Sequence, residues 1–83
     1  ARDSHPEIVI LDLDKVISID TTGLDILQTL HRSLQKRDAV LILCGLGKQP
    51  GSLIRRSGFL ERLGAENVHL DLAAALEHTR RKR

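Results

Sequence analysis

Apolar residues follow two different rhythms along the chain. Ile8–Leu13 and Ala39–Cys44 are almost uninterrupted aliphatic runs, as is typical of strands buried on both faces of a parallel sheet. Residues 22–37 instead carry leucines at helical spacing, which predicts an amphipathic helix between the two strands. Its apolar stripe is expected to comprise Leu27, Leu30 and Leu34, widened by Gly23, Leu24 and Ile26. Val68–Leu70 predicts a shorter third strand.

The segment between the second and third strands is expected to form two short helices. Gly45–Gly51 is a glycine-rich loop, and Pro50 suits the first turn of a helix that runs to about Ser57. Gly58 is expected to end that helix. Residues 59–63 should then make a brief helical turn that is closed by a further glycine, Gly64.

The last helix is predicted from Leu72 to about Arg81, with Asp71 as its N-cap. Its inward face should comprise Leu72, Ala75, Leu76 and Thr79. Residues 1–7 are polar and predict a loop or the end of a helix. The predicted fold class is therefore α/β, in the order β-α-β-α-β-α, with a mainly parallel sheet in a single domain of residues 1–83.

A parallel sheet of only three strands should have at least one open edge. We expect that edge to be covered by strands that precede Ala1 in the parent protein, or by another chain. A second copy of this chain would form a homodimer there. The sequence contains no methionine, which favours an excised domain.

Charge is distributed unevenly along the chain. Lys and Arg number 13 and four of them are residues 80–83, so the rest of the chain carries nine against 11 Asp and Glu. The only aromatic residue is Phe59. A nucleic-acid-binding protein usually has a basic face and stacking aromatics, so we expect no nucleic-acid partner. The basic C-terminus suits a solvated helix end, and a weak contact with an anionic membrane surface is the alternative.

The sequence gives little support to a metal, a cofactor or a catalytic centre. Cys44 lies within an apolar run, which predicts a buried and inert thiol, and a chain without a disulfide fits a reducing compartment. His5, His31, His69 and His78 are scattered, with no pair at metal-ligand spacing. No apolar stretch approaches the roughly 18 residues of a membrane span. We therefore expect no metal, no cofactor and no enzymatic activity.

The stretch "SIDTTGLD", residues 18–25, separates the first strand from the long helix. Thr22 is predicted to be the N-cap, and Asp25 lies three residues later, as in a capping box. Asp20 lies near the positive end of the helix dipole. Thr21 would then sit just before the cap, where its hydroxyl could be phosphorylated. A phosphate there would change the surface charge by almost two units, so Thr21 is the candidate switch.

The loop "GLGK" is a weaker candidate for a nucleotide or anion site. Its candidate residues are Gly45, Gly47 and Lys48. The loop departs from the P-loop pattern, because Gln49 replaces the Ser or Thr that should follow the lysine. Ile42 also stands where the first glycine of that pattern should be. A simple turn remains the main interpretation.

The stretch "VILDLDKVISIDTTGLDIL" resembles the core of the STAS domain, which SulP-type anion transporters share with bacterial anti-sigma factor antagonists. The family pattern is an aliphatic strand ending in Asp, a spacer, and Asp-Ser/Thr-Ser/Thr-Gly at a helix start. Here Val9–Asp12 and Asp20–Gly23 match it. "LILCGLGKQPGSLIRRSGFLERLG" and "NVHLDLAAALEHTR" resemble the later strands and helices of the family, so the resemblance covers roughly residues 8–80. It also implies that N-terminal strands and a first helix precede this chain.

The resemblance implies a regulatory interaction module rather than an enzyme. The segments at 45–50 and 58–64 look more like those of the transporters, whose STAS domain lies on the cytoplasmic side of the plasma membrane. The implied partner is then the transporter's own membrane domain, or another protein. The implied binding surface comprises Asp20, Thr21, Thr22, Gly23 and Asp25. The alternative is a free-standing anti-sigma factor antagonist, in which the residue matching Thr21 is phosphorylated by a partner kinase.

Overall fold

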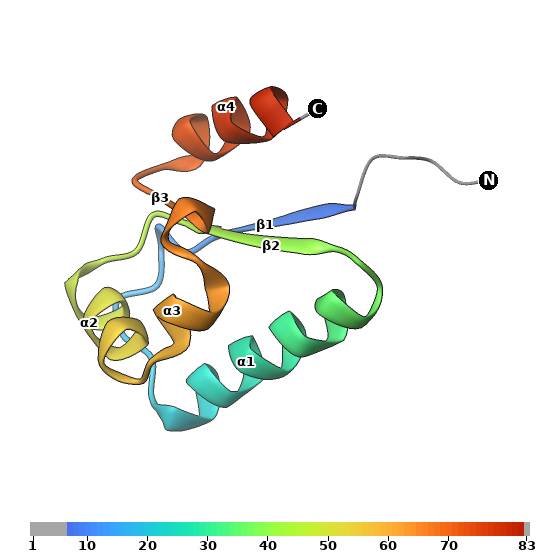
Figure 1. Cartoon of the computed structure of the whole chain (residues 1–83). Coiled ribbons are helices and arrows are strands. Elements are labelled where there is room, and N and C mark those ends of the chain that lie inside the picture. Colours follow the sequence, from blue (N-terminus) through green and yellow to red (C-terminus); the bar gives the residue numbers. More distant parts are fainter. Residues whose placement is uncertain (1–6, 83) are drawn as a thin grey trace.

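A computed structural model describes residues 7–82, and the interpretation of residues 1–6 lies outside this range. Three parallel strands, β1 (Ile8–Asp12), β2 (Val40–Cys44) and β3 (Val68–His69), form a sheet in the order β1-β2-β3. The sheet separates one helix, α4, from the other helices, so the molecule has three layers (Figure 1). The α/β class and the order of elements predicted from the sequence are confirmed.

Burial differs between the two long strands. The central strand, β2, is almost fully enclosed, with Leu41–Cys44 at most 1% exposed, as its aliphatic run predicted. The first strand is covered on both faces, as predicted, because Val9 and Leu11 pack on the main core and Ile8 and Ile10 on the smaller core beneath α4, but these residues are only partly buried. Within the described residues, β1 pairs with β2 on one side only, so it is an edge strand. Its open edge agrees with the expectation for a thin sheet.

The long helix, α1 (Thr21–Lys36), covers one face of the sheet together with α2 and α3 (Figure 1). Leu24 and Leu34 enter the main core, but Ile26 is 64% exposed, which corrects its place in the predicted stripe. Ile26 lies about 200° around the helix from Leu24, so the two side chains cannot face the same layer. The side chain that sequence reasoning missed is His31, which is buried against Phe59.

The connection from β2 to β3 contains the two predicted short helices, α2 (Lys48–Arg56) and α3 (Phe59–Leu63), and a 3-10 turn, η1 (Ala65–Asn67). The loop is shorter than Gly45–Gly51, because α2 already begins at Lys48. Gly58 and Gly64 follow the two helices with φ angles of 86° and 99°. Glycine adopts this left-handed region without steric cost, so both predicted helix ends are confirmed.

The last helix, α4 (Leu72–Lys82), packs on the opposite face of the sheet. The predicted cap is confirmed, because the Asp71 carboxylate accepts a 2.9 Å hydrogen bond from the Ala74 N–H. The predicted inward face is only half right. Ala75 and Thr79 are buried, whereas Leu72 and Leu76 are 43% and 48% exposed. Ala75 packs with Ile42 and Cys44 of the sheet, whereas the two leucines remain largely open to solvent.

The basic end of α4 makes only surface ion pairs among the described side chains. Arg80 and Arg81 lie 3.5 and 3.7 Å from the Glu77 carboxylate. The side chain of Lys82, and Arg83, lie outside the described part of the chain. Across residues 7–82, no helix combines the length and the apolar character that crossing a membrane requires.

Candidate functional site

The stretch Ser18–Asp25, called the motif turn below, links β1 to α1 and places its polar residues on the surface. Its N-cap is Asp20, whose Oδ1 accepts a 2.9 Å hydrogen bond from the Gly23 N–H. The predicted cap at Thr22, with Asp25 completing a capping box, is therefore wrong. Asp20 has the extended backbone of an N-cap (φ −107°, ψ −173°), and its negative charge favours the helix N-terminus.

The two threonines are the first two residues of α1 and are both exposed. Thr21 therefore lies just inside the helix and not before its cap. In the described chain, neither threonine hydroxyl makes a hydrogen bond, because the Asp20 carboxylate is the group that caps the N-terminus of α1. The hydroxyl of Thr21 is accessible to a modifying enzyme or to a docking partner, but its phosphorylation stays a prediction.

Gln49 fixes the motif turn from a distance of 30 residues. Its side-chain Oε1 accepts a 2.8 Å hydrogen bond from the Ile19 N–H, and its Nε2 donates a 3.0 Å hydrogen bond to the Ile19 carbonyl. The amide thus imitates a neighbouring strand and ties the turn to the first turn of α2. Sequence reasoning considered Gln49 only as a departure from the P-loop, and no local signal indicates this contact.

The glycine loop does not form one cradle. Gly45 lies against the end of β1, because a Cβ built there would be 2.9 Å from Asp12 Oδ1. A cavity of about 340 Å³ at this point is lined by three carboxylates, those of Asp12, Asp14 and Asp71. Burial raises the pKa of the Cys44 thiol, and these carboxylates raise it further. The carboxylates around Gly45 therefore repel an anion. The prediction that the Cys44 thiol is buried is confirmed.

Gly47 and Lys48 belong to a different cavity, of about 540 Å³, between α2 and the end of β3. Gly47 is the N-cap of α2 and offers no side chain to it, and Lys48 is exposed. Apolar residues also line this cavity, among them Leu46, Leu60 and Leu70. The three candidate residues of the loop are thus divided between two cavities, and a nucleotide or anion role for the loop stays an untested prediction.

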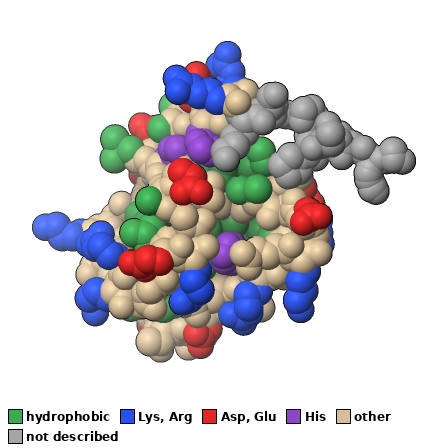
Figure 2. All heavy atoms as spheres, viewed as in Figure 1, with side chains coloured by type: hydrophobic (Ala, Val, Ile, Leu, Met, Phe, Trp, Pro, Cys, Tyr) green, Lys and Arg blue, Asp and Glu red, His purple; other side chains and the backbone are tan. Residues whose placement is uncertain are grey.

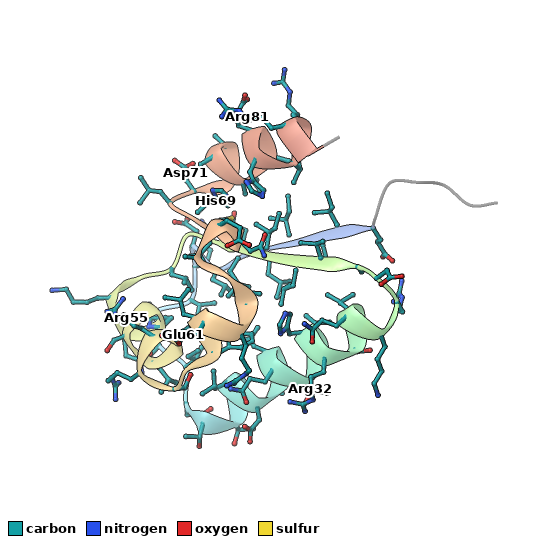
Figure 3. The ribbon with its side chains drawn as sticks, in the orientation of Figure 1. Arg32, Arg55, Glu61, His69, Asp71 and Arg81 are labelled. Carbon is teal, nitrogen blue, oxygen red and sulfur yellow. The ribbon has the colours of Figure 1, made fainter. Side chains whose placement is uncertain are left out.

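The structure brings together two histidines that the sequence spacing separates. The rings of His69 on β3 and His78 on α4 lie 4.6 Å apart at 50°. Figure 3 shows His69 beneath the start of α4, close to Asp71. In residues 7–82, no group of three or more His, Cys, Asp or Glu side chains is arranged to hold a metal ion. The pair is best understood as packing between α4 and the sheet.

Two exposed apolar residues flank the threonines of the motif turn. Ile17 is 88% exposed and Ile26 is 64% exposed. Single exposed aliphatic residues are normal on a protein surface, so the interest of these two lies in their position on either side of the motif turn. Sequence reasoning assigned Ile26 to the helix stripe because of its spacing, and it made no prediction for Ile17, which lies between the predicted strand and helix.

Comparison with known proteins identifies a consistent set of relatives. The STAS domain family model matches residues 1–75. Sulfate transporter 1.2 of Arabidopsis thaliana is 38% identical over 71 residues, which make up 86% of this chain and 11% of the relative. High affinity sulfate transporter 2 of Stylosanthes hamata is 32% identical over 73 residues, again 86% of this chain and 11% of the relative. The chain therefore spans about a ninth of the length of these relatives.

Two solved structures have the same fold. A sulfate transporter family protein from Wolinella succinogenes superimposes with a TM-score of 0.85 at 32% identity, covering 95% of this chain and 65% of that one. The STAS domain of a SulP transporter from Vibrio cholerae gives a TM-score of 0.87 at 24% identity, covering 99% of this chain and 64% of that one.

Proposed function

The chain belongs to the STAS domain family, and from that premise we propose that it serves a SulP-type sulfate transporter as a non-catalytic regulatory and interaction domain. The observation that carries the proposal is the 38% identity to a protein named a sulfate transporter over 86% of this chain. The domain would lie on the cytoplasmic side of the plasma membrane. Its principal partner would be the membrane domain of the same polypeptide.

The motif turn is the proposed docking surface. The Asp20 cap and the Gln49 clamp hold its backbone, while Thr21 and Thr22 remain accessible. A rigid, exposed turn loses little conformational entropy on binding, which favours affinity. Its polar residues lack the hydroxyl, imidazole and carboxylate arrangement of a nucleophilic active site, which supports binding over catalysis.

Two further contacts belong to the same proposal. The open edge of β1 could pair with upstream strands of the same polypeptide or with a second copy of the chain. The basic end of α4 could approach anionic headgroups, although Glu77 already neutralises part of its charge.

The second candidate function is a free-standing anti-sigma factor antagonist, which the exposed Thr21 hydroxyl supports. A phosphate on Thr21 would lie beside the Asp20 carboxylate, so it would add negative charge next to an existing one. That repulsion would alter the docking surface without requiring the fold to change.

The complete coding sequence distinguishes the two candidates at once. The transporter proposal expects a series of apolar segments of about 20 residues each upstream of Ala1. An open reading frame that begins shortly before Ala1, with no such segments, would refute it and favour the antagonist.

A further inference from the structure

A cavity of about 430 Å³ lies between α1 and α3, outside the motif turn and the glycine loop. It is lined by Gln28, His31, Arg32, Gln35, Phe59 and Arg62. Four of these residues come from α1 and two from α3, so the cavity depends on how the two helices pack. Among residues 7–82, no acidic side chain lines it, although the body of the chain is slightly acidic.

The cavity contains two guanidinium groups without a carboxylate partner in the described chain. The ion pairs within residues 7–82 involve Arg37, Arg80 and Arg81, and none involves Arg32 or Arg62. Arg32 donates one 3.2 Å hydrogen bond to the Thr29 hydroxyl, and the Arg62 guanidinium lies 5.9 Å from the Phe59 ring centre. A guanidinium carries five N–H donors, so most of the donor capacity of both groups is unused.

The floor of this cavity holds a buried polar side chain. His31 is only 9% exposed, and its ring meets Phe59 edge-on at 5.5 Å and 71°. Its ring nitrogens make no hydrogen bond with another group of residues 7–82. Burial lowers the pKa of His31, and the positive charges of Arg62 and then Arg32 lower it further. These nitrogens are not among the fully enclosed side-chain atoms of residues 7–82 that lack a hydrogen bond, so they reach solvent, where a bound acceptor would replace water.

Figure 3 shows Arg32 on the outer side of α1, well away from Arg55 and Glu61 on the α2 and α3 side of the molecule. Figure 2 shows several Lys and Arg side chains along the lower part of this face, with Asp and Glu side chains among them. The positive charge at the cavity therefore comes from its own lining, Arg32 and Arg62, and not from a uniformly basic face.

We propose that this cavity binds a small tetrahedral oxyanion, sulfate or hydrogen phosphate, between Arg32 and Arg62. The planar guanidinium fork matches two oxygens of such an ion. The amides of Gln28 and Gln35 supply further donors, and His31 donates an N–H to the ion. The proposal stands apart from the docking function, since it uses none of the residues of the motif turn.

Binding should be linked to the protonation of His31. The charged groups that face its ring are Arg32 on its own helix and Arg62 on α3, and both oppose protonation. An anion between them cancels that opposition, so the pKa of His31 should rise when the ion binds. By linkage, the ion should bind more tightly as the pH falls.

The test uses the 83-residue chain, titrated with sodium sulfate and separately with sodium phosphate. Sodium chloride keeps the ionic strength constant, so that general screening does not change. Amide and imidazole resonances are followed by NMR. We expect saturable shifts confined to α1 and α3, with either ion, and a higher pKa of His31 in its presence.

Matched double variants separate a built site from general attraction. Arg32→Gln with Arg62→Gln should weaken binding by at least about tenfold, because hydrogen bonds to charged groups are lost. Arg55→Gln with Arg56→Gln removes the same charge from exposed residues outside this cavity and should change affinity by less than about twofold. Circular dichroism verifies that both variants fold. In the unaltered chain, the pKa of His31 measured with and without the ion tests the proposal without any variant, since the pKa should rise when the ion binds.

Three results would overturn the proposal. Shifts that rise linearly without saturation, or that chloride alone reproduces, mean that there is no site. Equal weakening in both double variants means that only net charge matters. Tighter binding of a short polyglutamate peptide than of either ion would assign the cavity to an acidic segment of a protein partner.

Discussion

Replacing Gly45 by alanine should destabilise the domain by about 2–5 kcal/mol. Gly45 has a φ angle of 72°, a left-handed conformation that costs a non-glycine residue about 1–2 kcal/mol. The added Cβ would also lie 2.9 Å from Asp12 Oδ1, 3.0 Å from the Asp14 nitrogen and 3.1 Å from the Asp14 Cα. Such overpacking typically costs a further 1–3 kcal/mol, roughly.

The structure gives the strained neighbours little freedom to move. The Asp12 carboxylate accepts a 3.1 Å hydrogen bond from the Asp14 N–H, so its displacement would break that bond. The other two atoms belong to the Asp14 backbone, in the turn that follows β1. A domain of 83 residues has a total stability of about 4–12 kcal/mol, so this loss could unfold a large fraction of the molecules.

The assay is urea denaturation followed by circular dichroism, with Gly51→Ala as the matched control. Gly51 lies inside α2, and a Cβ there would meet only the Leu46 Cβ at 3.8 Å, an ordinary contact. Alanine should therefore leave stability unchanged or raise it by up to about 1 kcal/mol. A Gly45→Ala variant within about 0.5 kcal/mol of the wild type would refute the reasoning about the β1 end.

Three other predictions concern the turn and the buried histidine. Asp20→Ala should cost about 0.5–2 kcal/mol by urea denaturation, whereas Thr22→Ala should cost less than about 0.5 kcal/mol; the reverse order would restore Thr22 as the cap. Gln49→Ala removes two hydrogen bonds and should cost about 1–3 kcal/mol. It should also speed amide exchange at Ile19, and unchanged exchange there would contradict the clamp. The lowered pKa of His31 means that the unfolded chain binds its proton more readily, so the stability from neutral His31 is present above pH 6.5 and is lost as the pH falls below it. The free energy of unfolding, measured between pH 7.5 and 5, should therefore decrease as the pH falls. It should change less steeply with pH in Arg62→Gln, because the Arg62 charge contributes to the lowered pKa of His31. An equally steep change in both proteins would argue against that role of Arg62.

Local signals in the sequence predicted the framework of the fold. The aliphatic run of β2, the glycines at 58 and 64 and the Asp71 cap all depend on interactions within a few residues, and the structure confirms each of them. The choice between Asp20 and Thr22 as N-cap is also local. It failed because both residue types cap helices well, and only the backbone angles distinguish them.

The parts that could not be predicted depend on contacts distant in sequence. The Gln49 clamp on Ile19 joins residues 30 apart, and the pairing of His69 with His78 requires the placement of α4 on the sheet. The exposure of Ile26 depends on which side of α1 packs against the sheet. The cavity at His31 likewise depends on the packing of α3 against α1, which are distant in sequence. Periodicity predicts which side of a helix is apolar, but not what packs against each of its turns.

The central claim is that the motif turn is a docking surface through which this domain regulates a sulfate transporter. The most direct test is sulfate uptake by cells that express the complete protein with Ile17→Glu and Ile26→Glu, compared with Ser33→Glu and Ala65→Glu. Both pairs add two carboxylates at exposed positions, but only the first alters the turn's surroundings. At equal membrane abundance, the account predicts altered uptake for the first pair and wild-type uptake for the second. Equal uptake by both pairs and the wild type would contradict it.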